Sequence, residues 1–214
     1  MFSPGSRILF QGDSITDASR DRAQLEPNDG AGLGRGYAFL AAARLLHDHP
    51  SSDLRVYNRG ISGNRVPDLQ RRWAADAEEI EPQLLSILIG VNDIWHKMEG
   101  RYAGSVQDYE DGFRALLDQT RRRLPAAQLV VGEPFALGIG AVTREWFPEF
   151  DQRRAVAARL ASEFGAAFVP FQSVLDRAVA AGTSPAYWTT DGVHPTPQGH
   201  QLLADAWLTT VLSS

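Results

Sequence analysis

The sequence of 214 residues contains no cysteine and a single lysine, Lys97. Without cysteine, disulfide bonds and thiolate catalysis are excluded. The 21 basic residues are outnumbered by 26 acidic ones, and the formal net charge of -5 repels polyanions, so no nucleic-acid partner is expected. No apolar run approaches the roughly 18 residues that a membrane-spanning helix needs, so no membrane partner is expected either.

The N-terminal residues also lack the features of a secretory signal, because no basic stretch is followed by a long apolar one. The first apolar run is only Ile8-Leu9-Phe10. A cytoplasmic location is therefore the default expectation. The length predicts one domain, residues 1–214, since a single hydrophobic core can grow to about 250 residues before chains usually divide.

Short apolar runs alternate along the chain with longer segments of helical spacing, a pattern typical of βαβ units and a mainly parallel sheet. The predicted strands are Arg7–Gln11, Leu54–Asn58, Leu84–Gly90, Leu129–Gly132 and Ala167–Pro170. The predicted helices are Gly36–His47, Val66–Glu79, Val106–Leu124, Phe150–Phe164 and Pro197–Leu212. Five strands with interleaved helices predict an α/β fold, a three-layer α/β/α sandwich that is flavodoxin-like in strand order. Two polar, Gly-containing segments receive no assignment: Asp17–Arg35 and Gly132–Pro148.

Chemically active residue types follow the predicted strands. In doubly wound sheets ligands bind at the carboxyl ends of the strands. The stretch Gly12-Asp13-Ser14 follows the first predicted strand, residues 59–64 follow the second, and Val91-Asn92-Asp93 follows the third. The stretch Asp191-Gly192-Val193-His194 precedes the last helix. An acyl-transfer site needs a nucleophile, a base, a group that orients the base and donors for an oxyanion, and these segments offer each of them.

Ser14 is the candidate nucleophile, because a strand-to-helix turn projects its Oγ and leaves its backbone N–H without a helical acceptor. The alternative is that Ser14 only caps a helix. Gly63 offers an unobstructed backbone N–H and Asn92 a side-chain amide, so both are candidate oxyanion donors beside the N–H of Ser14. For these two the alternative is an ordinary turn residue.

Asp191 and His194 are the candidate partners of Ser14. Three residues apart, they can meet in a tight turn in which the carboxylate accepts from Nδ1 and Nε2 faces the serine. The remaining histidines have no such partner in the sequence, and surface or packing roles are expected for them: His47, His49, His96 and His200.

The four segments together resemble the SGNH hydrolases, also called the GDSL family of esterases and lipases, over the whole chain. The resemblance rests on Gly12-Asp13-Ser14, Gly63, Gly90-Val91-Asn92-Asp93 and Asp191-Gly192-Val193-His194. It implies a flavodoxin-like α/β/α fold and ester hydrolysis through an acyl-enzyme, with no metal and no cofactor. It also implies a Ser14, Asp191, His194 triad. Thr16 stands where a G-x-S-x-G elbow has its second glycine, which argues against the α/β-hydrolases.

Within that family the chain looks most like intracellular carbohydrate acetylesterases, including those that act on acetylated xylo-oligosaccharides. The similarity lies in residues 12–17, in Gly32-x-Gly34-x-Gly36-Tyr37 and in Ile94-Trp95. It implies an acetylated oligosaccharide as the small-molecule ester substrate, and a homo-oligomer. Asp13 is a candidate substrate-binding residue. Aromatic residues that flank the catalytic segments can hold a sugar ring, although aromatic rings as often serve packing: Trp95, Tyr187 and Trp188.

Several other substrates and functions remain open at this point. A simple short-chain ester, a thioester or a lipid suits the same catalytic residues. Neither unassigned segment offers a broad apolar surface, which favours a short acyl chain. A flavodoxin-like protein that binds a phosphorylated ligand is the alternative outside enzymes, but the sequence has no G-x-x-x-x-G-K-[ST]. A zinc hydrolase is disfavoured because no H-E-x-x-H occurs.

Overall fold

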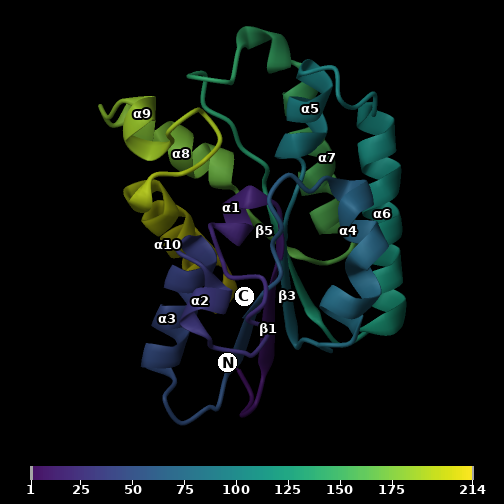
Figure 1. The fold of residues 1–214 in the computed structure, drawn as a ribbon, viewed down its shortest axis with the longest axis vertical. Coiled ribbons are helices and arrows are strands. Elements are labelled where there is room, and N and C mark those ends of the chain that lie inside the picture. Colours follow the sequence, from purple (N-terminus) through teal and green to yellow (C-terminus); the bar gives the residue numbers. More distant parts are fainter. Residues whose placement is uncertain (1, 214) are drawn as a thin grey trace.

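A parallel sheet with helices on both faces forms the centre of the computed structural model, which describes residues 2–213 (Figure 1). Within these residues the strands are β1 (Arg7–Gly12), β2 (Arg55–Asn58), β3 (Leu84–Leu88), β4 (Gln128–Gly132) and β5 (Ala167–Val169). They pair in parallel in the order β2-β1-β3-β4-β5, the predicted flavodoxin-like order. From β1 the chain adds β2 on one side and then β3, β4 and β5 on the other, so the strand order reverses between β1 and β3. A ligand site is expected at the carboxyl ends of these two strands.

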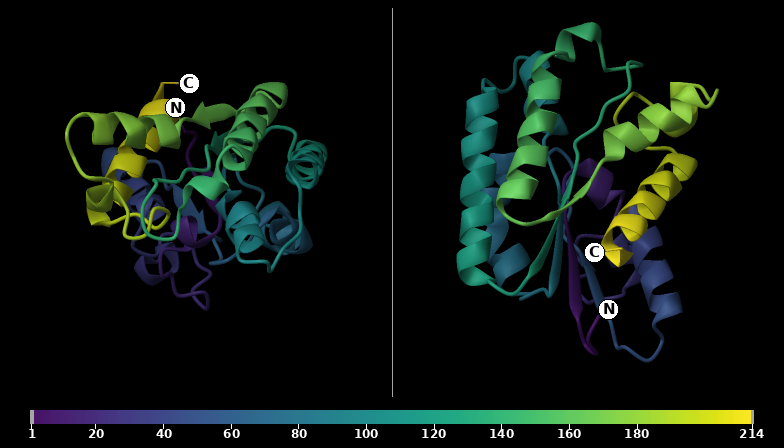
Figure 2. Two further views of the ribbon diagram at one scale, coloured as in Figure 1. Left: turned by 90° about the horizontal axis from the view of Figure 1, so that it is seen from above. Right: turned by 180° about the vertical axis from the view of Figure 1, so that it is seen from behind.

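Two helical layers cover the sheet (Figures 1 and 2). One contains α3 (Tyr37–Asp48), α8 (Phe171–Ala180) and α10 (Pro197–Leu212), and the other contains α4 (Val66–Trp73), α6 (Val106–Arg123) and α7 (Glu149–Glu163). Along β1, Ile8 and Phe10 pack into the first layer and Leu9 into the second. This alternation buries both faces of the strand, as a parallel sheet requires.

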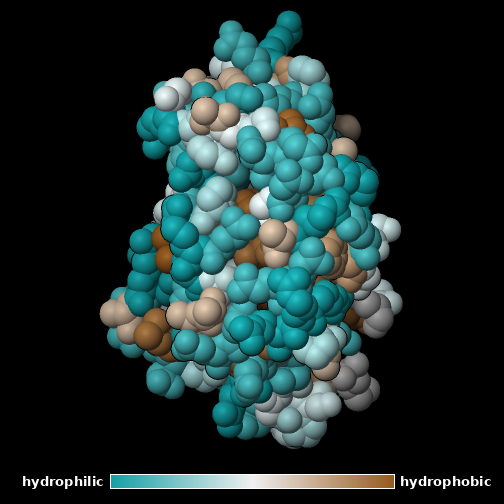
Figure 3. Space-filling view, turned by 90° about the vertical axis from the view of Figure 1, so that its right-hand side faces the viewer, coloured by the Kyte–Doolittle hydropathy of each residue, from teal (hydrophilic) through white to brown (hydrophobic). Residues whose placement is uncertain are grey.

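The outer face of the second layer is mostly hydrophilic (Figure 3). Its helix α6 begins at a capping box in which Ser105 Oγ accepts the Asp108 N–H, and it buries one apolar stripe that includes Phe113 and Leu117. No helix within residues 2–213 is both long enough and apolar enough to cross a membrane.

The predicted strands and helices are confirmed to within a few residues, with one correction in the second layer. The helix predicted over Val66–Glu79 ends at Trp73, and the chain continues as a π-helical turn, η1 (Ala74–Glu78). The start of the last helix agrees with the prediction, because Thr196 Oγ1 accepts the Gly199 N–H at 3.2 Å.

Several shorter helices were not predicted. Two lie within the unassigned segments, namely α2 (Gly30–Leu33) and the 3-10 helix η2 (Arg144–Trp146). Others follow strands or precede the last helix: α1 (Ser14–Asp17), α5 (Val91–Met98), α8 and α9 (Pro185–Trp188). The helices α1 and α5 begin directly at the carboxyl ends of β1 and β3, so they determine where the candidate catalytic side chains lie.

Candidate active site

Ser14 is the first residue of α1 and follows the end of β1 after one intervening residue. Gly12 makes this abrupt turn feasible, since a Cβ there would lie 2.3 Å from the Leu88 carbonyl oxygen and 2.5 Å from Thr16 Oγ1. Asp13 caps the new helix, because its Oδ1 accepts the Ile15 N–H at 3.0 Å. The Ser14 N–H lies in the first turn, where a helix provides no backbone acceptor.

Ser14, His194 and Asp191 form a continuous chain of hydrogen bonds. Ser14 Oγ lies 2.9 Å from His194 Nε2, and His194 Nδ1 lies 2.7 Å from Asp191 Oδ2. The other carboxylate oxygen, Oδ1, accepts the backbone N–H groups of Val193 at 3.0 Å and His194 at 2.8 Å. Partial burial raises the pKa of Asp191, but the hydrogen bonds from His194 and Val193 outweigh it and hold that pKa below its usual value. Asp191 therefore remains a carboxylate beside the imidazole at neutral pH.

The turn that carries Asp191 and His194 is held from two sides. The Leu137 N–H donates to the Gly192 carbonyl at 2.8 Å, and the Ala141 N–H donates to the Asp191 carbonyl at 3.0 Å. On the other side the Thr190 N–H donates to the His194 carbonyl at 2.8 Å. The segment Gly132–Pro148, which had no assignment from sequence, thus supports the turn that carries Asp191 and His194.

The three candidate oxyanion donors gather at the same edge of the sheet. Gly12 and Leu88 are register partners, so the segments after β1 and β3 leave the sheet side by side. The Ile61 N–H donates to the Gly12 carbonyl at 3.1 Å, which places the loop of residues 60–64 against the end of β1 that precedes Ser14. Gly63 has φ +82, a left-handed conformation that favours glycine. Asn92 lies in the first turn of α5, and its Nδ2 donates to the Asn64 carbonyl at 3.1 Å.

Asp17 is a site residue whose role the sequence did not reveal. It is 2% exposed, and its Oδ2 accepts from the Ser62 backbone N–H at 2.9 Å and from Ser62 Oγ at 3.0 Å. The same oxygen accepts from Arg22 Nη2 at 2.5 Å. Burial raises the pKa of Asp17, but these hydrogen bonds lower it by more, so the group remains a carboxylate. Asp17 therefore joins the segment Asp17–Arg35 to the loop that carries Gly63.

The aromatic candidates differ in what they contact. The Trp95 ring lies 5.6 Å from the His194 ring, and its Nε1 donates to Glu99 Oε1 at 3.0 Å. Tyr187 is 50% exposed and packs edge-on against Trp188 with ring centroids 4.9 Å apart. The indole of Trp188 donates to Thr183 Oγ1 at 2.6 Å. Trp95 is thus the aromatic ring in direct contact with the candidate base.

Two carboxyl groups lie buried beneath the site. Asp13 is 1% exposed and Asp93 is fully buried, and burial raises the pKa of each to about 7. Asp13 precedes Ser14 in the chain and Asp93 follows Asn92. Asp13, a predicted substrate-binding residue, is therefore buried as the cap of α1, next to Ser14 in the chain.

Within residues 2–213, no histidine other than His194 forms a hydrogen bond with Ser14. His200, on α10, is partly buried, and its Nδ1 accepts the Tyr37 backbone N–H at 3.1 Å. Burial, with a smaller effect of the nearby His194, lowers the pKa of His200 to about 4. His96 is partly buried, which lowers its pKa as well. His47 lies in the last turn of α3, and His49 follows as its C-cap.

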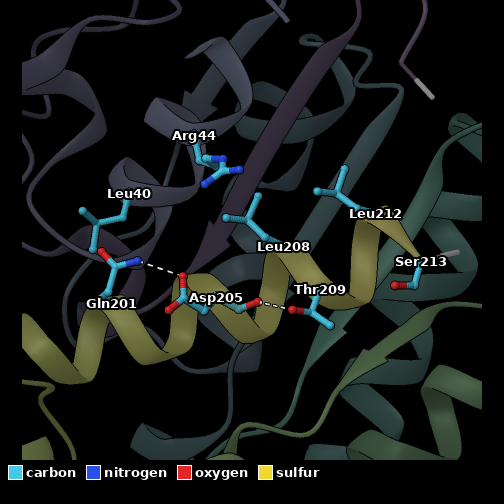
Figure 4. Close-up of a pocket in the computed structure, with 8 residues that line it drawn as sticks. All are labelled: Leu40, Arg44, Gln201, Asp205, Leu208, Thr209, Leu212 and Ser213. Atoms are coloured by element: carbon cyan, nitrogen blue, oxygen red, sulfur yellow. Dashed lines mark hydrogen bonds between the residues drawn. The ribbon is translucent and has the colours of Figure 1, made fainter. Parts of the chain in front are cut away.

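A groove of about 390 Å³ lies elsewhere, between α3 and α10 (Figure 4). Leu40 and Arg44 line it from α3, and Leu208 and Leu212 are among the residues that line it from α10. No predicted site residue lines it. Within residues 2–213, no three His, Asp or Glu side chains gather where they could hold a metal ion.

Comparison with known proteins agrees with this geometry. Residues 10–202 match the model of the GDSL-like lipase/acylhydrolase family. The chain belongs to that family. One member, an acetylxylan esterase from Geobacillus stearothermophilus, is 34% identical over 208 residues, which are 95% of this chain and 93% of that protein. A solved structure of an acetylxylan esterase from Geobacillus stearothermophilus is 34% identical and matches with a TM-score of 0.85 over 98% of this chain and 95% of that one.

A second solved structure is more similar. The crystal structure of a GDSL-like lipase from Parabacteroides merdae has a TM-score of 0.96 and 43% sequence identity, over 100% of this chain and 99% of that one. The all-parallel sheet described above is therefore the fold of this family. Together with the acetylxylan esterase relative, membership of the family shows that the chain is a carboxylic ester hydrolase.

Proposed function

We propose that this hydrolase removes acetyl groups from carbohydrate through an acyl-enzyme on Ser14. The observation that carries the proposal is the unbroken chain from Ser14 Oγ through both nitrogens of His194 to Asp191, with distances of 2.9 and 2.7 Å. A neutral imidazole that donates Nδ1–H to a carboxylate presents an acceptor at Nε2. The relative that acts on acetylxylan supports an acetylated carbohydrate as the substrate.

In the first step, His194 Nε2 takes the hydroxyl proton as Ser14 Oγ bonds to the ester carbonyl carbon. The carbonyl oxygen becomes an oxyanion, which the N–H groups of Ser14 and Gly63 and the amide of Asn92 stabilise. Asp191 stabilises the imidazolium that has formed. When the tetrahedral intermediate collapses, the bond to the sugar oxygen breaks and that oxygen takes the proton from His194.

In the second step, water attacks the acetyl group on Ser14. His194 accepts a proton from the water and then returns it to Ser14 Oγ as acetate leaves. The His194 side chain is 41% exposed, which is consistent with access for that water. Every group that this cycle needs belongs to the chain itself.

The surroundings of His194 support a small acyl group and a sugar. Trp95 packs against the imidazole, and we assign it as one wall of the acyl and sugar site. Tyr187 is half-exposed, so its ring is available to a sugar face, with Trp188 supporting it from the side. We assign Asp13 an indirect role, since its cap holds α1 and hence Ser14 in place.

A substrate panel tests the proposal. We expect acetylated xylo-oligosaccharides to be deacetylated with a higher kcat/KM than a simple alkyl acetate, because the sugar adds aromatic stacking. Ser14→Ala removes the nucleophile and should abolish turnover of both, whereas Ser51→Ala, at an exposed serine in the turn before β2, should change neither.

The panel also separates the alternatives. Faster turnover of thioesters, or of long-chain esters, would identify a thioesterase or a lipase of the same family. The predicted cytoplasmic location and the predicted homo-oligomer stay predictions; cell fractionation tests the first and analytical ultracentrifugation the second.

A further inference from the structure

The loop that carries Gly63 forms a short turn, in which the Asn64 N–H donates to the Ile61 carbonyl at 3.1 Å. It connects β2 to α4, and a Cβ added to Gly63 would meet no atom within 4 Å, so no neighbour packs against that position. Glycine has more conformational freedom to lose than any other residue. An oxyanion donor must nevertheless be fixed before the reaction, because a misplacement of about 1 Å can lower the rate about 10²-fold. Other residues must therefore hold this loop.

Arg72, on α4, reaches across to three segments of the site. Its Nε donates to Asn64 Oδ1 at 2.8 Å, its Nη1 to the Arg59 carbonyl at 2.8 Å, and its Nη2 to the Gly12 carbonyl at 3.3 Å. Gly12 ends the strand before the nucleophile, Arg59 follows β2, and Asn64 adjoins Gly63. One planar guanidinium thus contacts both sides of the oxyanion loop and the nucleophile strand at once.

The guanidinium is itself held in place. Its Nη1 also donates to Asp76 Oδ2 at 2.7 Å, and the side chain is only 15% exposed. Asp76 lies in the π-helical turn η1, where its backbone carbonyl accepts from Gln11 Nε2 of β1 at 2.8 Å. Turns of this type often occur at functional sites. Because all three nitrogens of Arg72 have acceptors, the side chain has one well-defined position.

Asn64 connects Arg72 to the remaining donor. Its side-chain oxygen accepts from Arg72, and its backbone carbonyl accepts from Asn92 Nδ2 at 3.1 Å. We propose that Arg72 is a positioning residue for the oxyanion hole, which it fixes by anchoring Asn64 between Gly63 and Asn92. This inference rests on the proposed function, because it concerns the oxyanion hole of that site.

The test compares two neighbouring arginines of α4. Arg72→Lys keeps the positive charge, but a single ammonium group cannot make all the hydrogen bonds of the guanidinium at once. Arg72→Gln removes the charge as well as these hydrogen bonds. The matched controls are Arg71→Lys and Arg71→Gln, since Arg71 is 68% exposed and, among the described residues, its only ion pair is with Asp68 on the same helix. A nitrophenyl phosphonate that reacts with the serine to completion gives the concentration of active sites, so kcat is expressed per intact site.

We expect both Arg72 variants to lose about 10- to 100-fold in kcat on nitrophenyl acetate, with KM within threefold of wild type. The rate of phosphonylation should fall in parallel. The shape of the pH–rate profile should not change, because Arg72 donates to none of Ser14, Asp191 and His194. The Arg71 controls should stay within twofold of wild type. A purely structural role for Arg72 would lower the number of active sites and leave kcat per site unchanged.

Two results would overturn the proposal. One is an Arg72→Lys variant whose kcat per site is within threefold of Arg71→Lys, and the other is a rise in KM with kcat unchanged. If the Arg72 variants do not fold, Asn64→Ala removes the acceptor while Arg72 stays in place, and a wild-type kcat for that variant overturns it equally. Neither assay uses a carbohydrate, so failure of the carbohydrate proposal would be seen separately, in the substrate panel.

Discussion

Asp191 has two roles that the variant Asp191→Asn can distinguish: it sets the tautomer of His194, and it stabilises the turn that carries both residues. In the structure Asp191 Oδ1 accepts two backbone N–H groups, whereas Oδ2 accepts from His194 Nδ1. An asparagine has one acceptor oxygen, and the two backbone donors hold it at the Oδ1 position. Its NH₂ group then faces Nδ1 and donates to it, because an amide nitrogen cannot accept.

An Nδ1 that accepts a hydrogen bond places the imidazole proton on Nε2, which lies 2.9 Å from Ser14 Oγ. In that tautomer His194 cannot take the serine proton. The same replacement in serine proteases lowers kcat by about 10⁴-fold. We expect a loss of about 10³- to 10⁴-fold here, equivalent to about 4 to 5.5 kcal/mol of transition-state stabilisation. The free energy of unfolding should change by less than about 0.5 kcal/mol, because the backbone contacts remain.

Asp191→Ala is the informative comparison. It removes the acceptor of both backbone N–H groups, which should cost about 1 to 3 kcal/mol in unfolding free energy, but it leaves His194 free to adopt either tautomer. The alanine variant should therefore be the less stable and the more active of the two. Steady-state kinetics on nitrophenyl acetate and urea unfolding measure both quantities. An asparagine variant that is more active than the alanine variant, or within tenfold of wild type, would refute the tautomer argument.

Three further outcomes are expected. Asn92→Ala removes a side-chain oxyanion donor and should lower kcat about 10²- to 10³-fold with little change in KM, measured by steady-state kinetics. His200 accepts the Tyr37 N–H only when neutral, so its contribution to stability is fully present above the unfolded pKa of 6.5 and is lost as pH falls towards the folded pKa of about 4. The amide oxygen of Asn in His200→Asn can accept this hydrogen bond without titrating. Relative to that variant, the free energy of unfolding of wild type, measured with urea, should fall by up to about 3 kcal/mol between pH 6.5 and pH 4. Across nitrophenyl esters, kcat/KM should be highest for acetyl and fall from butyryl onward, by steric exclusion.

Each of these has a clear contrary result. A rise in KM with kcat unchanged would make Asn92 a substrate-binding residue. Parallel curves of unfolding free energy against pH for wild type and His200→Asn would show that His200 does not titrate in that range. The difference between the two curves is the relevant quantity, because buried Asp13 and Asp93 make the protein less stable as pH rises, which is opposite to the effect of His200. Octanoyl esters hydrolysed faster than acetyl esters would refute the acetylesterase proposal and leave the esterase assignment intact.

The sheet and the long helices were predictable because local patterns encode them. The strands are short apolar runs bounded by polar or Gly residues, and α10 begins at Thr196-Pro197, a strong start signal. The helix α5 was not predicted, because Gly90-Val91-Asn92-Asp93 resembles a turn and the helix is only 8 residues long. The end of α4 at Trp73 was also missed, since the π-helical turn continues the same helical spacing.

The candidate triad was predictable in part from spacing, because Asp191 and His194 are only three residues apart. The residues that support the site were not. Arg72 contacts Gly12 across 60 positions of sequence, and Asp17 contacts Ser62 across 45. Such contacts depend on the order of the strands and the direction of α4, and no local pattern reports them. Asp17 lies within the segment that pointed to the family, but its side chain had no evident partner there.

Mapping the adduct of a nitrophenyl phosphonate by mass spectrometry tests most directly whether Ser14 is the nucleophile. The reagent stops at a stable covalent product on the attacking oxygen, so it marks the residue that His194 activates. We predict one adduct per chain, on the peptide that contains Ser14, formed in proportion to the loss of esterase activity and absent from Ser14→Ala and strongly slowed in His194→Ala. Complete loss of activity with Ser14 unmodified, or with the adduct on another residue, would contradict the assignment.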